Sequence, residues 1–163
     1  MADTRWLDDG EQRTWRSFLT ATRLLFDRVE RQLQQEAGLP HAYFEIMVRL
    51  SEVPGRTLRM SDLASTSLSS RSRISHAVSR MEEAGWVRRR PYESDRRGQL
   101  AELTDAGMAK LEQTAAGHVE VVRSLLFDAL TTAQQDALRQ VCDAVVEHIS
   151  DGDPPWPATP DPA

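Results

Sequence analysis

Residues 61–103 read SDLASTSLSSRSRISHAVSRMEEAGWVRRRPYESDRRGQLAEL. This stretch predicts a short helix, a tight turn, a second helix and a β-hairpin with a basic tip. Ser61 is expected to cap the first helix, which runs to about Leu68, because a serine oxygen accepts a free N–H group at a helix start. The serines Ser67, Ser69 and Ser70 are then expected to supply a break and a cap for the second helix, which begins at about Ser70. That helix runs to about Ala84, and the glycine that follows suits a left-handed C-terminal position.

The second helix has two contrasting faces. Apolar residues recur at helical spacing on one side and predict its buried face, at Ile74, Ala77, Val78 and Met81. The other side carries short donors and guanidinium groups, with neither Glu nor Lys until its far end. Small side chains permit close approach to a DNA major groove and arginine binds guanine or phosphate, so we interpret this side as a DNA-contacting face, with a solvated helix face as the alternative. Its candidate residues are Ser70, Arg71, Ser72, Arg73, Ser75, His76, Ser79 and Arg80.

A small β-sheet is predicted after this helix. Residues 86–92 and 99–103 read as the two strands of the hairpin, and residues 58–60 as a short third strand that joins them. Arg88 and Arg90 lie one pleat apart on the same face of the first strand. We therefore expect both to bind the phosphate backbone beside the place where the hairpin tip meets DNA.

The hairpin tip, residues 93–98, is predicted to be a turn in which Gly98 is able to adopt a positive φ. Arg96 is our candidate for insertion into a minor groove, where the electrostatic potential is most negative at narrow A·T-rich tracts. Asp95 is expected to fix the shape of the tip, by accepting backbone N–H groups or by pairing with an arginine. Arg97 is then left for a phosphate or for the pair with Asp95.

Charge is unevenly distributed along the 163 residues, whose net charge is -5. Residues 56–97 hold ten arginines and five acidic residues, a local net charge of +5, whereas the remainder holds ten basic and twenty acidic residues, a net of -10. A basic module on an acidic frame is typical of a DNA-binding protein whose body stays away from the phosphates. Only Lys110 is a lysine, and the planar guanidinium of arginine is the better bidentate partner for phosphate and guanine.

Long amphipathic helices are predicted on both sides of this module. Their apolar stripes are longer than a small DNA-binding body can cover, which predicts a two-fold dimer built from both chain ends; a monomer with its own helical cap is the alternative. Thr104 is expected to cap the helix after the hairpin, and Thr131 with Gln134 to form a capping box for the last helix. The predicted organisation is a flexible lead at residues 1–9, one domain at residues 10–150 with dimerisation helices at 10–37 and 104–149 and a DNA-binding module at 41–103, and a disordered proline-rich tail at 151–163.

Four short motifs follow one another through the middle third of the chain: Asp62-Leu63-Ala64, RMEEAGWV at residues 80–87, Asp95-Arg96-Arg97, and Leu103-Thr104-Asp105-Ala106-Gly107. As a set they resemble the MarR family of bacterial transcription regulators, and the helical pattern on both sides extends the resemblance to about residues 10–150. The resemblance implies a mainly α-helical fold with a small antiparallel β-wing, that is, a winged helix-turn-helix with a helical dimerisation frame. It also implies a homodimer that usually responds to a small molecule or an oxidant.

The resemblance further implies an effector site where the first two helices meet the long helix that follows the wing. An aromatic or phenolic molecule would suit such a site. The candidate residues for it are Trp15, Phe18, His41, Phe44 and Met47, with ordinary core packing as the alternative.

Other chemistry is not favoured by the sequence. Cys142, the single cysteine, lies on an apolar helix face and is expected to be buried and inert, with a redox-responsive regulator as the alternative. Redox-sensing members of the family carry their reactive cysteine near the N-terminus, where this chain has none. His41, His118 and His148 are too scattered to predict a metal site. No nucleophile–base pair, phosphate loop or paired carboxylate is spaced for catalysis, so we expect neither an enzyme nor a cofactor.

The sequence therefore predicts a sequence-specific DNA-binding regulator, by default a repressor, that binds a pseudo-palindromic double-stranded operator as a homodimer and is released by a small ligand. Two recognition helices about 34 Å apart would match one turn of DNA. The alternative is a module that uses its winged helix to dock on another protein. No apolar run approaches the ~20 residues of a membrane span, and the acidic, polar start does not resemble a signal peptide. We expect a cytoplasmic protein.

Overall fold

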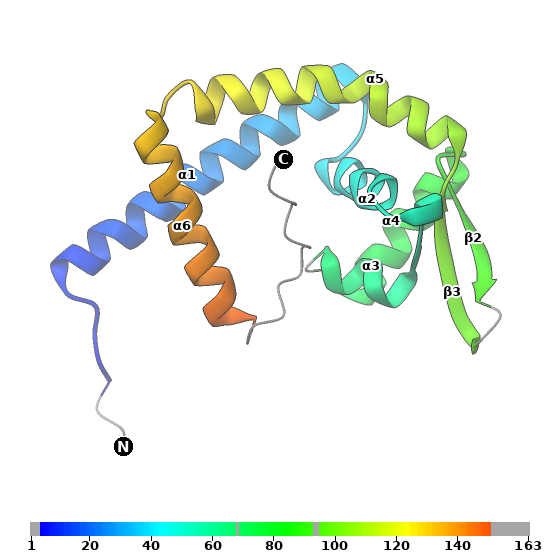
Figure 1. The fold of residues 1–163 in the computed structure, drawn as a ribbon, viewed down its shortest axis with the longest axis horizontal. Coiled ribbons are helices and arrows are strands. Elements are labelled where there is room, and N and C mark those ends of the chain that lie inside the picture. Colours follow the sequence, from blue (N-terminus) through cyan, green and yellow to red (C-terminus); the bar gives the residue numbers. More distant parts are fainter. Residues whose placement is uncertain (1–3, 68, 93–94, 151–163) are drawn as a thin grey trace.

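The structure, a computed structural model, describes residues 4–67, 69–92 and 95–150. These residues form a mostly helical chain with one small antiparallel sheet, which confirms the predicted fold class (Figure 1). Leu68, at the predicted end of the first helix of the module, and the predicted tail at residues 151–163 lie outside the described residues. In chain order the elements are α1 (Asp9–Gln32), η1 (Leu33–Ala37), α2 (His41–Ser51), η2 (Pro54–Arg56), β1 (Thr57–Arg59), α3 (Met60–Thr66), α4 (Arg71–Glu83), β2 (Val87–Tyr92), β3 (Asp95–Leu103), α5 (Asp105–Val122), η3 (Arg123–Phe127) and α6 (Thr132–Ile149).

Both chain ends form a helical frame. α1 continues into the π-helical turn η1, and α5 continues into η3, so each helical segment is longer than its α-helical part. Side chains bind the free N–H groups at the helix starts: Asp8 with Glu11 forms a capping box on α1, and Thr131 with Gln134 forms one on α6. Thr104 caps α5. The helix starts predicted at Thr104 and Thr131 are confirmed.

The second part of the molecule, α2 to β3, lies under one end of α5 (Figure 1). Its sheet has the strand order β1-β3-β2, with both pairs antiparallel. Ala101 on the central strand pairs with Leu58 on one side and with Arg89 on the other. The short strand predicted at residues 58–60 is therefore present as β1, one residue earlier, and it joins the hairpin as expected.

The hydrophobic core lies inside this second part of the molecule. α4 buries Ile74, Val78 and Met81, as its helical spacing predicts, and Gly85 after it has a φ of 77°. The apolar core residues come from the end of α1, from η1 and from Leu111 of α5, as well as from α2, α3, α4 and the sheet, so burial of apolar area holds these elements together. The largest fully buried side chains are Leu33, Leu39, Ile46, Met47, Leu50, Leu63, Met81, Val78 and Val87.

Two local predictions are wrong. Ser61 does not cap α3, because β1 leads directly into that helix and Ser61 already lies in its first turn; the N-cap residue is Arg59, without a side-chain bond. Ser61 Oγ instead donates to Asp62 Oδ1 at 3.0 Å. The hairpin turn is also shorter than predicted, because β3 begins at Asp95, opposite Tyr92. Pairing with β2 overrides the low strand propensity of these residues, and the register is irregular next to Tyr92.

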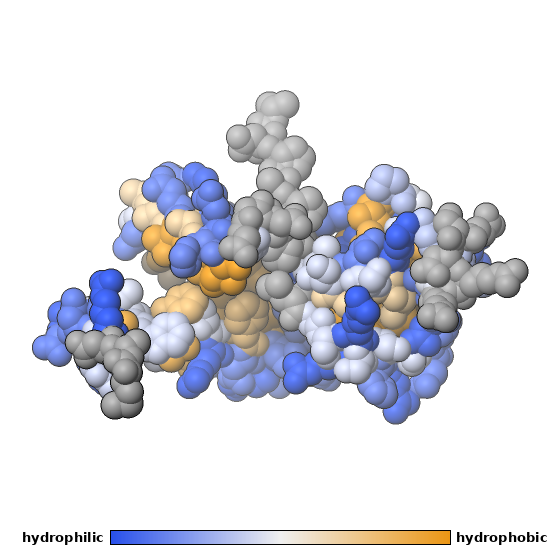
Figure 2. Space-filling view, turned by 90° about the horizontal axis from the view of Figure 1, so that it is seen from below, coloured by the Kyte–Doolittle hydropathy of each residue, from blue (hydrophilic) through white to orange (hydrophobic). Residues whose placement is uncertain are grey.

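The frame keeps a large apolar surface exposed. α6 buries none of its residues within the single chain, and Figure 2 shows hydrophobic residues gathered in a hollow in its left half, where Figure 1 places α6 and the start of α1. Scattered exposed apolar residues are normal, but large contiguous patches mark interaction sites. The exposed large apolar residues of the frame helices are Trp15, Phe18, Leu24, Phe26, Val119, Leu125, Phe127, Leu138, Val141, Val145, Val146 and Ile149.

Cys142 belongs to this exposed part of α6. The prediction of a buried cysteine is wrong for the single chain, in which Cys142 is a free, exposed thiol. The apolar stripe on which it lies has no partner within the chain, and that is why its apolar neighbours do not bury it. Among the residues that the structure describes, no helix is both long and apolar enough to cross a membrane.

Candidate nucleic-acid interface

The candidate reading face is the outward side of α4. Ser70 begins this helix by accepting the Arg73 N–H at 3.4 Å, and its hydroxyl lies 3.1 Å from that of Ser72. Arg71, Arg73 and His76 are exposed, and their side chains form no hydrogen bond or ion pair with the described part of the chain. Their donors are therefore available to a partner, as the sequence predicts for a DNA-contacting face.

The C-terminal half of the same face is already bound within the molecule. Arg80 Nη1 lies 2.9 Å from Glu83 Oε2. Ser79 Oγ donates to the Ser75 carbonyl at 3.0 Å and accepts from Arg89 Nη2 at 2.8 Å. Ser75, Ser79 and Arg80 were predicted to contact DNA, and the structure gives each of them a partner in this chain.

Arg89 is a residue of this candidate interface that was not among the residues predicted from the sequence. Its Nη2 also donates to the Ser75 carbonyl at 2.7 Å, and its backbone N–H donates to Glu82 Oε1 at 2.9 Å. The alternation of side chains along a strand could have shown that Arg89 points to the face opposite that of Arg88 and Arg90. The sequence did not show that α4 packs on the side to which it points.

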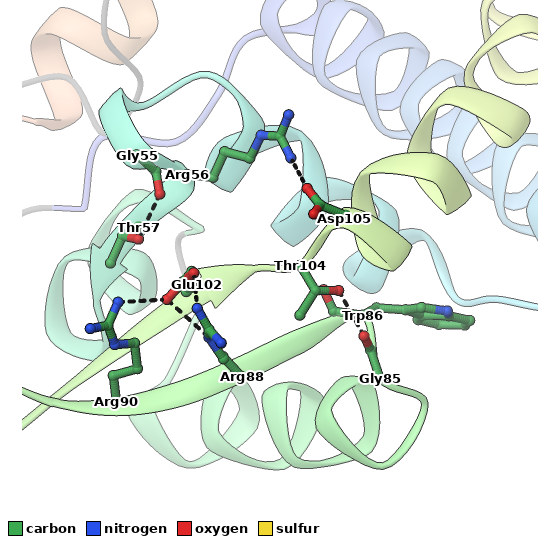
Figure 3. Close-up of polar contacts among 10 residues, drawn as sticks. All are labelled: Gly55, Arg56, Thr57, Gly85, Trp86, Arg88, Arg90, Glu102, Thr104 and Asp105. Atoms are coloured by element: carbon green, nitrogen blue, oxygen red, sulfur yellow. Dashed lines mark hydrogen bonds and ion pairs between the residues drawn. The ribbon is translucent and has the colours of Figure 1, made fainter.

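Arg88 and Arg90 lie together on the opposite face of the sheet, as predicted, and share one carboxylate (Figure 3). Arg88 donates to both Glu102 oxygens, at 2.6 and 3.1 Å, and Arg90 Nη1 donates to Glu102 Oε2 at 3.1 Å. The hydrogen bond from Arg88 is the main cause that holds the pKa of Glu102 below its ordinary value, and the same bond raises the pKa of Arg88. Glu102 therefore remains charged and orients both guanidinium groups.

Two further arginines belong to the rim of the sheet. The Arg59 guanidinium lies 4.0 Å from the centre of the Tyr92 ring and also binds the Tyr92 hydroxyl. Arg56 Nη1 lies 3.1 Å from Asp105 Oδ1, at the start of α5 (Figure 3). The side chains of the predicted tip residues, Asp95, Arg96 and Arg97, lie outside the described part of the structure, so their predicted roles stay predictions.

The wing is joined to α5 through Thr104. Its hydroxyl donates to the Gly85 carbonyl at 2.7 Å and lies 3.1 Å from the Trp86 carbonyl (Figure 3). The same hydroxyl accepts the Gly107 N–H at 3.0 Å. One residue thus fastens the end of α4, the start of β2 and the first turn of α5. The Leu-Thr-x-x-Gly motif found in the sequence is therefore a structural joint between the sheet and the frame.

The predicted effector residues divide into two groups. Trp15 and Phe18 stack on each other at a centroid distance of 6.1 Å, and both are exposed on α1. His41 and Phe44 instead meet at His118, with ring centroids at 6.2 and 4.4 Å from it. The fifth candidate, Met47, is fully buried in the core.

His118 belongs to this ring cluster, although it was not among the predicted effector residues. Its ring lies half-buried on Phe44, and Phe26 reaches His41 from α1 at a centroid distance of 5.8 Å. Burial, and after it the nearby His41, lower the pKa of His118. A metal site is not formed here, because no group of three or more His, Cys, Asp or Glu side chains converges among the described residues.

A polar cavity of about 300 Å³ lies between η1 and α5, separate from the predicted effector residues. Lys110 lines it and donates to the Ala37 carbonyl at 2.8 Å, which ties the end of the first helical segment to α5. Gln32 Nε2 donates to Glu36 Oε2 at 2.7 Å across the cavity wall. The lining residues are Gln32, Glu36, Ala37, Lys110, Gln113, Thr114 and Gly117.

The lowered pKa of His118 predicts a loss of stability in acid. Protonation is disfavoured in the folded state, so the unfolded chain binds more protons below about pH 6.5 and the unfolding free energy falls as the pH drops through that value. Urea unfolding at pH 7.5 and 5.5 measures this loss, which we expect to be smaller for His118→Gln. His148→Gln, on exposed α6, is the matched control and should leave the loss unchanged.

A family model described as the MarR family matches residues 37–98. Among solved structures, Sco3205 from Streptomyces coelicolor, a MarR family transcriptional regulator determined in complex with DNA, is 48% identical, covers 96% of this chain and 99% of its own, and has a TM-score of 0.87. AbsC, another MarR family regulator from Streptomyces coelicolor, is 42% identical, covers 91% of this chain and 99% of its own, and has a TM-score of 0.85.

A curated relative gives the same result. The HTH-type transcriptional regulator PecS from Dickeya dadantii is 28% identical over 132 residues, which are 80% of this chain and 79% of PecS. The matches to Sco3205 and AbsC extend over nearly the whole of each chain at more than 40% identity, and they include the frame helices as well as the winged module. The protein belongs to the MarR family of transcription regulators.

Proposed function

We propose that the protein is a sequence-specific DNA-binding regulator that inserts α4 into a major groove. The observation that carries the proposal is the exposed donor face formed by Arg71, Arg73 and His76, whose side chains have no partner among the described residues, on a helix whose other face is buried in the core. Sco3205, 48% identical, was determined in complex with DNA. The transcription regulators of this family are not enzymes, and double-stranded DNA is the partner that suits this face.

The protein is proposed to act as a homodimer through its chain ends. α6 buries none of its own residues, and Val141, Val145 and Ile149 are 61, 49 and 75% exposed. A second copy of the chain is the occupant that would cover the same patch on both subunits. Such a dimer presents two copies of α4, and a pseudo-palindromic operator with half-sites one helical turn apart fits that symmetry. The organisation into a frame at both chain ends and a central module belongs to this proposal, as does a cytoplasmic location.

Repression released by a small aromatic or phenolic ligand is the proposed mode of regulation. The ring cluster of Phe26, His41, Phe44 and His118 supports it, because it lies between the frame and the DNA-reading module. A planar ligand that inserts among these rings would change how α1 and α5 sit on α2. Trp15 and Phe18 are then better assigned to the apolar surface of the frame than to this cluster.

The reading role of α4 is tested by Arg73→Ala and His76→Ala. Each is expected to weaken binding to a duplex selected by the wild-type protein by about 1–3 kcal/mol if its side chain contacts a base. Fluorescence anisotropy over a range of salt concentrations gives both affinity and salt dependence. Arg139→Ala is the control, because it removes the same charge from exposed α6. Unchanged sequence preference in the Arg73, His76 double variant would refute the assignment.

A further inference from the structure

The three consecutive arginines of β2 are divided between two faces of the sheet. Arg88 and Arg90 bind Glu102 on the outer face, with side chains that are 59 and 58% exposed. Arg89 points the other way and is only 23% exposed, because it lies against α4. The same residue type on the same strand therefore meets two different environments.

Arg89 is attached to α4 at three places. Its Nη2 binds the Ser75 carbonyl at 2.7 Å and the Ser79 hydroxyl at 2.8 Å. Glu82 accepts the Arg89 backbone N–H at 2.9 Å, and its other oxygen lies 3.7 Å from Arg89 Nη1. β2 is an edge strand, so Glu82 satisfies an N–H group that points away from β3.

Resting on the proposed DNA-binding function, we propose that Arg89 is a positioning residue that holds the wing in a fixed relation to the reading face of α4, so that both engage the operator together. The Ser75 carbonyl lies one helical turn after Arg71 and directly before His76, so the clamp sits in the middle of the reading helix. In this arrangement Ser75 and Ser79 accept hydrogen bonds from Arg89 and do not contact bases.

The physical consequence of the clamp is a higher effective concentration of the wing at the flanking DNA. A wing held by Arg89 meets the flanking minor groove as soon as α4 enters the major groove, because its orientation has already been fixed in the free protein. A wing without the clamp must be ordered at the moment of binding. The flanking contacts then contribute less to affinity, while the contacts of α4 with the central bases remain.

The experiment measures discrimination of the flanks. Duplexes are selected from a random pool with the wild-type protein, and the dissociation constant is measured for the selected duplex and for one whose A·T-rich flanks are replaced by G·C. The flank ratio, defined as the second constant divided by the first, reports the wing. Arg89→Ala is expected to weaken binding to the selected duplex by roughly 10-fold and to bring the flank ratio close to one.

Arg88→Ala is the matched control, since it removes the same side chain and charge from the neighbouring position on the outer face. A loss of charge alone would lower the salt dependence equally in both variants. Of these two variants, only Arg89→Ala should change the flank ratio. Arg89→Lys keeps the charge but offers no planar fork, and it should behave like Arg89→Ala.

Ser79→Ala is a second variant for the case that Arg89→Ala fails to fold. It removes one hydrogen-bond acceptor of Arg89 and leaves the arginine in place. It should lower the flank ratio by itself, and the Ser79, Arg89 double variant should be no worse than Arg89→Ala alone. A flank ratio that survives Arg89→Ala, or additive effects of the two changes, overturns the clamp while DNA binding stands. A wild-type protein that selects no duplex overturns the proposed function itself and the clamp with it.

Discussion

Gly107→Ala is expected to lower the unfolding free energy by about 3 kcal/mol, in the range of severe overpacking, although alanine normally stabilises a helix by up to about 1 kcal/mol relative to glycine. A Cβ atom at residue 107 would lie 2.1 Å from the Trp86 carbonyl oxygen and 2.6 Å from Leu103 Cδ1. The Trp86 carbonyl also accepts the Thr104 N–H at 3.0 Å. The backbone of the joint between the wing and α5 would therefore have to move.

Gly117→Ala is the matched control on the same helix. A Cβ atom there would meet Glu36 Oε2 at 2.6 Å, but this oxygen is the end of a flexible side chain that can turn away. Its effect should be about 1 kcal/mol or less, because helix propensity offsets the displacement of Glu36. Chemical denaturation of both variants measures the difference. Equal stability of the two would show that α5 is free to shift against the sheet.

Val145→Asp is expected to convert the proposed dimer into a monomer and to abolish tight binding to a palindromic duplex. Val145 is 49% exposed in the single chain, within the apolar stripe of α6. A carboxylate without a partner in an apolar interface costs several kcal/mol, and a monomer loses the second half-site. Sedimentation should give about 18.4 kDa for the variant and about twice that value for the wild type.

Gln140→Asp is the control for this change, because residue 140 lies on the opposite side of α6 from the apolar stripe at ~100° per residue. It should remain dimeric and should bind the duplex normally. A wild-type protein that sediments as a monomer and still binds a palindrome tightly would contradict the dimer. Slow reaction of the Cys142 thiol in the wild type and fast reaction in Val145→Asp would add independent support, because a dimer would cover this part of α6.

The sequence by itself determined the order of the helices, the three-stranded sheet and the buried face of α4. These features depend on local rules. Ile74, Val78 and Met81 recur at the period of a helix, and Gly85 ends the helix where a positive φ is required. Thr104 and Thr131 carry their own capping chemistry, so the starts of α5 and α6 could be read from single residues and their neighbours.

Tertiary structure alone decided which polar groups are free and which are bound. The sequence shows three identical arginines at residues 88–90. In the structure Glu102 binds Arg88 and Arg90, whereas Arg89 binds α4. Such pairings depend on elements that pack from elsewhere in the chain, and residue type does not encode them. The same reason explains Cys142: its apolar neighbours suggested burial, but the surface that would cover them is not supplied by the chain itself.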